Sequence, residues 1–224
     1  MARGTRFAAP VVPRSCGAFR MATMTAFRPR TLRVDGADVA CLHLAAAAPR
    51  ASVLWVFGSG GGFHGPAGGL YDRLGAALAP DGVTSLQVAY RRPGELGPCV
   101  ADVLGGVAAL VQEVPGPLAL VGHSFGGAVV IRAAVASPWV TAVAALSSQA
   151  YGTERVGAIA PRPIFLLHGT DDEVLPAACS QDIHSRAGEP KLLLQPRCRH
   201  GLDECRDELD RELGAWLRGE LLGA

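Results

Sequence analysis

The stretch LALVGHSFGGAVVIRAAV, from Leu118 to Val135, decides the fold of this chain. An apolar run breaks at Gly122-His123-Ser124-Phe125-Gly126-Gly127 and then resumes at once with helical spacing. Glycines on both sides of Ser124 allow the chain to turn sharply without a Cβ clash. The stretch therefore predicts a buried strand, a strained turn with the hydroxyl of Ser124 exposed at its apex, and a helix.

The rest of the chain alternates in the same way between short apolar runs and segments with helical spacing. Runs expected to form strands are ADVACLHLA, ASVLWVF, VTSLQVAY, PLALVG, VTAVAALS, PIFLLHG and KLLLQ. Segments expected to form helices include LYDRLGAALA, VADVLGGVAALVQEV, AACSQDIHSRA and the closing DECRDELDRELGAWLRGE. This alternation predicts one α/β domain over residues 37–224, a mostly parallel sheet with helices on both faces.

Composition narrows the class of protein. The chain has 224 residues, 49% of them hydrophobic, and a formal net charge of +1. So weak a charge favours neither nucleic acid nor an anionic membrane as partner, and no apolar run approaches the roughly 20 residues that span a bilayer. Six scattered cysteines, without a framework or zinc-site spacing, indicate reduced thiols and no metal site. A cytoplasmic location is expected, and the oligomeric state stays open.

The first 33 residues differ from the rest of the chain. Arginines are frequent up to Arg33, no acidic residue precedes Asp35, and no continuous apolar core of a secretory signal is present. Two interpretations stay open: an organellar transit peptide, which would make the location organellar, or a true start at Met21 or Met24. Either way, residues 1–33 are expected to lie outside the folded domain.

Gly122-His123-Ser124-Phe125-Gly126 fits G-x-S-x-G between a strand and a helix, and here the chain resembles the α/β-hydrolase superfamily. The resemblance covers most of the chain from about Ala37 and implies a nucleophile, an acid and a histidine in that chain order. HGTDDEVLP supplies Asp171 and Asp172, and the family's spacing from Gly169 favours Asp172. His200, in CRHG, is the expected base. All three candidates, Ser124, Asp172 and His200, follow predicted strands at one edge of the sheet.

The glycine-rich loop VFGSGGGFHGPAGG has two interpretations. Gly60, Gly62 and Gly65 formally match the dinucleotide signature G-x-G-x-x-G, but the next strand ends in LQVAYRR without the acid that a ribose requires. In the hydrolase interpretation the backbone N–H of Ser59, with Gly60 as alternative, joins that of Phe125 to form the oxyanion hole. The family commonly has His where this chain has Phe57, which leaves the anchoring of the loop open.

The expected reaction is hydrolysis of a small-molecule carboxylic ester or thioester through an acyl-enzyme, with no metal or organic cofactor. The predicted strands VTAVAAL and PIFLLHG are separated only by the segment SSQAYGTERVGAIAPR. This segment is too short to form the helical cap that many superfamily members carry. An open site like that of dienelactone hydrolases and carboxylesterases is implied. The former use Cys as nucleophile, so Ser124 favours an esterase. His64 and Arg91 are candidate substrate contacts. A catalytically silent hydrolase fold used for binding stays open as the alternative.

Overall fold

The computed structural model describes Met1 and residues 26–223. Within this range eight strands form one sheet, in the order β1-β2-β4-β3-β5-β6-β7-β8. The strands are β1 (Arg28–Val34), β2 (Ala37–Leu44), β3 (Ala51–Val56), β4 (Val83–Val88), β5 (Leu118–His123), β6 (Ala142–Leu146), β7 (Ile164–Leu167) and β8 (Lys191–Leu194). Strand β2 runs antiparallel to β1 and β4, and all other neighbours are parallel.

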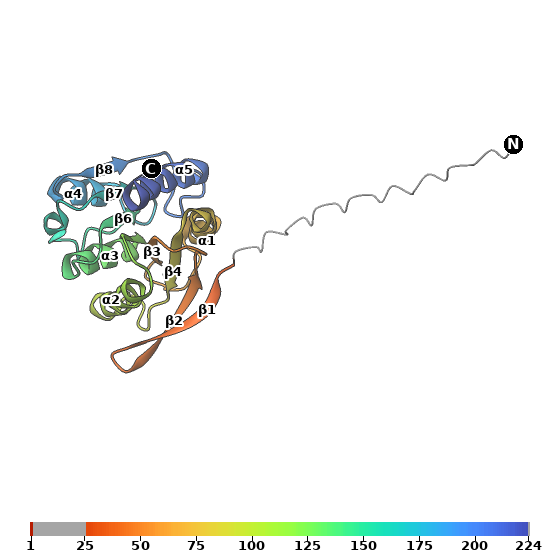
Figure 1. The fold of residues 1–224 in the computed structure, drawn as a ribbon. Coiled ribbons are helices and arrows are strands. Elements are labelled where there is room, and N and C mark those ends of the chain that lie inside the picture. The colour runs from red at the N-terminus through yellow and green to blue at the C-terminus, as the bar shows by residue number, and fades with distance from the viewer. Residues whose placement is uncertain (2–25, 224) are drawn as a thin grey trace.

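Helices cover both faces of the sheet (Figure 1). They are α1 (Pro66–Leu78), α2 (Leu96–Glu113), α3 (Phe125–Ala136), α4 (Ala178–Arg186) and α5 (Arg206–Leu222), with 3-10 turns η1 (Ala79–Asp81) and η2 (Val156–Ile159). Helices α1 and α5 pack on one face, and α2, α3 and α4 on the other. The central strands β3, β4 and β5 are buried along their whole length; the apolar runs of β3 and β5 predict this, whereas β4 buries Thr84, Ser85 and Gln87 between its apolar residues.

Helix α2 is, within residues 26–223, long and apolar enough to cross a membrane by length and composition. One face of it is buried against the sheet, with Cys99, Val103, Val107 and Leu110 in the core. Its apolar character is accounted for by this packing on the sheet and on α3.

The predicted alternation of strands and helices is confirmed, and so is the lack of a large cap: residues 147–163 contain only the short turn η2. The expected N-terminal boundary at residue 33 is wrong. Arg28–Val34 form β1, which pairs along its full length with β2. Leu32 and Val34 are buried, and the guanidinium of Arg30 forms an ion pair with Glu113 of α2. The remainder of the expected extension, with Met21 and Met24, lies outside the described residues.

Candidate active site

Ser124 occupies the junction between β5 and α3 in a backbone conformation that is rare for a residue with a side chain. Its φ is 58° and its ψ is −122°. Two hydrogen bonds hold the turn: the N–H of Ser124 donates to the carbonyl of Leu146 over 2.8 Å, and its carbonyl accepts from Gly127 over 3.0 Å. Strain of this kind persists only where the surroundings impose it, and it clusters at functional sites.

Two glycines around Ser124 are required by close backbone contacts. A methyl group on Gly122 would collide with the carbonyl oxygen of Gly126, and one on Gly126 would collide with that of Phe57. The second contact brings the start of α3 directly against the loop that follows β3. The glycines of the motif therefore pack two backbone segments together as well as permitting the turn.

The loop after β3 lies beside the nucleophile candidate. A Cβ placed on Gly58 would be 3.5 Å from Cβ and 3.9 Å from Oγ of Ser124. In the part of the chain that the structure describes, neither the N–H of Ser59 nor that of Phe125 donates a hydrogen bond to another residue.

Two tyrosines anchor this loop, which carries Phe57. The hydroxyl of Tyr71 donates to the carbonyl of Val56 over 2.7 Å, and that of Tyr90 donates to the carbonyl of Phe57 over 3.1 Å. The ring of Tyr90 also meets Phe125 edge to face, with centroids 6.0 Å apart. Tyr90 therefore touches both backbone segments that carry the free N–H groups.

Asp172 and His200 meet directly, although 28 residues separate them in the chain. Nδ1 of His200 lies 2.8 Å from Oδ2 of Asp172, whose side chain is 0% exposed, whereas that of His200 is 14% exposed. The other oxygen, Oδ1, accepts the N–H groups of Val174 and Leu175 over 2.9 and 2.8 Å. Burial alone would raise the pKa of Asp172, but the hydrogen bonds from Leu175, His200 and Val174 outweigh it and hold the pKa below its ordinary value.

The neighbouring Asp171 does not take part in this contact. Its carboxylate pairs at the surface with Nε of Arg197, 3.0 Å away. Of the two acids that competed in the sequence, the structure brings Asp172 to His200.

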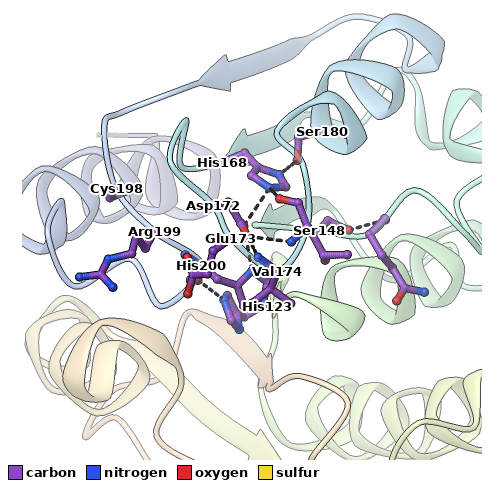
Figure 2. A network of polar contacts seen from close by, with 12 residues as sticks. His123, Ser148, His168, Asp172, Glu173, Val174, Ser180, Cys198, Arg199 and His200 are labelled. Atoms are coloured by element: carbon purple, nitrogen blue, oxygen red, sulfur yellow. Dashed lines mark hydrogen bonds and ion pairs between the residues drawn. The ribbon is translucent and has the colours of Figure 1, made fainter.

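His123 attaches the loop of His200 to the strand that carries Ser124. Its Nε2–H donates to the carbonyl of His200 over 2.9 Å, and the two rings lie 4.8 Å apart (Figure 2). The N–H of His200 in turn donates to Glu173 over 3.2 Å. Burial lowers the pKa of His123 to about 4, although the contact with the His200 carbonyl opposes this, so the ring is neutral near pH 7. The backbone of His200 is therefore held on both sides.

The remaining candidates take different positions. Gly60 is exposed, with open space where a side chain would be. His64 has a side chain that is 60% exposed, and its Nδ1 lies 2.6 Å from Oδ2 of Asp72. A buried amide, that of Gln87, donates to Asp72 and accepts the N–H of His64, each over 2.7 Å. His64 thus belongs to a hydrogen-bond network with Asp72 and Gln87.

The guanidinium of Arg91 is held by contacts with β1 and α2. Its Nε donates to the fully buried carboxylate of Asp102 on α2, and another guanidinium nitrogen donates to the carbonyl of Val34 over 2.8 Å. These contacts tie β1 and α2 to the end of β4. A structural ion pair therefore replaces the expected contact with a substrate carboxylate.

Three residues of the site were not singled out as functional in the sequence: Tyr71, Tyr90 and His168. The tyrosines offered one signal, since a buried phenol needs a hydrogen-bond partner. His168 closes a strand, and its hydrogen-bond partner cannot be deduced from that position alone. Among residues 26–223, no group of three or more His, Cys, Asp or Glu side chains is placed to hold a metal ion.

No protein-family model matches the chain, and no curated protein matches it in sequence. Solved structures do match in fold. A dienelactone hydrolase from Anabaena variabilis superposes with a TM-score of 0.78 at 17% identity, over 88% of this chain and 99% of that one. The esterase domain of a Rhodothermus marinus protein gives 0.70 at 19% identity, over 86% and 98%. An esterase from Pyrococcus furiosus gives 0.70 at 15%, over 98% and 100%. The chain therefore has the α/β-hydrolase fold.

Proposed function

We propose that the protein is a serine hydrolase that cleaves a carboxylic ester or thioester through an acyl-enzyme intermediate. The observation that carries this proposal is the 2.8 Å contact between His200 and the buried Asp172, together with the hydrogen bond from His123, the residue before Ser124, to the carbonyl of His200. A serine hydroxyl is a weak nucleophile until a base takes its proton, and the base needs an acid that fixes its tautomer. This pair supplies both.

In the first step, Nε2 of His200 accepts the proton of Ser124 as Oγ attacks the substrate carbonyl. Asp172 accepts the Nδ1–H, so the unprotonated nitrogen of the neutral ring is Nε2, and the carboxylate stabilises the imidazolium that forms. The negative charge on the carbonyl oxygen is stabilised by the N–H groups of Ser59 and Phe125. His200 then protonates the leaving alcohol or thiol, and the acyl group stays on Ser124.

In the second step, water replaces the leaving group. His200 takes a proton from the water as it attacks the acyl carbon, and the same two N–H groups stabilise the second oxyanion. Ser124 leaves with the proton that His200 returns. Each role in this cycle is filled by a residue of the chain itself.

A small ester with an apolar part is the substrate class that we propose. The esterase and dienelactone hydrolase neighbours, which this chain covers over almost their whole length, support it. Apolar side chains also follow β6 and β7, the two successive strands on one side of β5. Tyr151, after β6, is 75% exposed, and Val174, after β7, is 60% exposed.

The test uses a fluorophosphonate probe and p-nitrophenyl esters of increasing acyl length. Labelling and turnover by the wild-type protein are expected, and Ser124→Ala should abolish both while its circular dichroism stays unchanged. Ser185→Ala, on the exposed side of α4, is the matched control and should behave as wild type. Turnover that survives in Ser124→Ala would remove the nucleophile assignment. A folded wild-type protein that neither labels nor turns over would favour the catalytically silent binding protein.

A further inference from the structure

A second buried histidine contacts Asp172. His168 follows β7 directly, and its Nε2 lies 3.0 Å from Oδ2 of Asp172, with both side chains 0% exposed. This is the same oxygen that lies 2.8 Å from Nδ1 of His200. Figure 2 shows Asp172 between the two rings. The carboxylate therefore faces two imidazoles, of which only that of His200 reaches the surface of the site.

The surroundings of His168 fix which of its nitrogens carries the proton. Nε2 faces two acceptors, Oδ2 of Asp172 and, 3.1 Å away, the carbonyl of Leu175. The lone pair of an unprotonated Nε2 would point at both acceptor oxygens and be repelled by them, so Nε2 bears the hydrogen. Nδ1 lies 2.8 Å from Oγ of the fully buried Ser180, whose hydroxyl then donates to it. Burial lowers the pKa of His168, so the ring is neutral and has a single N–H.

This N–H completes the hydrogen bonding of Asp172. Oδ1 accepts two backbone N–H groups, and Oδ2 accepts the N–H of His200 and shares the N–H of His168 with the carbonyl of Leu175. A buried carboxylate whose lone pairs are all engaged has little freedom to rotate about its Cβ–Cγ bond. Without the donor from His168, Oδ2 would be held only by His200, the group that it has to orient.

We propose that His168 is a positioning residue for the reaction: by donating Nε2–H to Oδ2, and backed by Ser180, it fixes the carboxylate that orients His200. The inference rests on the proposed function, because it assigns His168 a role in presenting Asp172 to the base. His168 does not touch the substrate, and its effect passes through Asp172.

A pair of variants matched in shape tests the role of the N–H. Gln and Met have side chains of the same length, but only Gln carries an N–H donor, close to where Nε2 of His lies. His168→Gln should keep kcat for p-nitrophenyl butyrate within about 3-fold of wild type. His168→Met should lose about 10-fold in kcat with KM unchanged, the range found when a group that orients a functional side chain is removed. His184→Met, on α4, is the control and should match wild type.

Equal kcat values for the Met and Gln variants, whether both high or both low, would overturn the proposal, because the N–H would then be irrelevant.

The tautomer of His168 provides a second test, which depends neither on the stability of a variant nor on turnover. In ¹⁵N-histidine-labelled wild-type protein, the His168 ring should be neutral with its proton on Nε2 from pH 6 to 8. A proton on Nδ1, or a doubly protonated ring, would refute the assignment. Absence of ester hydrolysis in the wild type would refute the proposed function instead, and the tautomer would still decide the role of His168.

Discussion

Replacing Asp172 by Asn perturbs the proposed site without changing its shape. The N–H groups of Val174 and Leu175 both point at Oδ1, so the carbonyl oxygen of an Asn would take that side. Its NH₂ group would then stand where Oδ2 is, facing the N–H groups of His168 and His200. The NH₂ group of the Asn and the two imidazole N–H groups would then be donors facing donors, with no acceptor between them. The simplest relief is for His200 to move its proton to Nε2, and such a ring cannot accept the proton of a serine.

The expected magnitude comes from this change of tautomer. The corresponding substitution in a serine protease triad lowers kcat by about 10⁴, which at about 1.36 kcal/mol per factor of ten is roughly 5 kcal/mol of transition-state stabilisation. We expect a loss of that order for Asp172→Asn, with little change in KM. The assay is steady-state hydrolysis of p-nitrophenyl butyrate, with folding checked by circular dichroism.

Asp171→Asn is the matched control. It removes a carboxylate that is 49% exposed and forms an ion pair with the exposed Arg197, so activity should stay within about 2-fold of wild type. The reasoning would be refuted if Asp172→Asn kept more than a tenth of wild-type kcat, or if the two variants lost activity to the same extent.

Three further changes test other parts of the site. Tyr90→Phe removes a single hydrogen bond to the loop after β3, and we expect about 1 kcal/mol of lost stability in urea titrations together with a lower kcat. His123 has a folded pKa of about 4, below its ordinary 6.5, so the unfolded chain binds more protons in this window and stability falls as pH drops below 6.5. His123→Gln should therefore abolish about 2 kcal/mol of the loss that the wild type suffers between pH 7 and pH 5, and an unchanged pH dependence would contradict the assignment. Arg91→Ala leaves the buried Asp102 unpaired and should destabilise the fold by about 3 kcal/mol, measured by urea titration, without raising KM for carboxylate-bearing esters.

The sequence predicts best where local pattern and fold rules agree. Glycine spacing around Ser124 and a strand–helix switch suffice for the turn, because backbone sterics at such a junction leave few alternatives. Asp172 and His200 follow predicted strands, and parallel strands bring their carboxyl ends to one edge. Their contact could therefore be expected once the chain order and the spacing from Gly169 that the resemblance implies are combined with this fold rule.

The sequence predicts poorly where a long-range partner decides the role of a side chain. Arg28–Val34 has only Leu32 and Val34 facing the core, and its arginines suggested an extension, since nothing local points to Glu113 as the partner of Arg30. Arg91 looks like a free cation at the active edge until the buried Asp102 is placed beside it.

The same limit applies within the site. His168 ends a strand, but only the folding back of residues 172–175 brings Asp172 to its ring. Likewise, the sequence left the anchoring of the loop after β3 open, because the two tyrosine hydroxyls that hold it do so through contacts over 15 and 33 residues of chain.

The most direct measurement of the central claim is a crystal structure of the protein after reaction with a fluorophosphonate ester. The account predicts phosphorus bonded to Oγ of Ser124, Nε2 of His200 within hydrogen-bond distance of that oxygen, and the phosphoryl oxygen on the N–H groups of Ser59 and Phe125. Phosphorus on any other residue, or an imidazole of His200 turned away from Ser124, would contradict it.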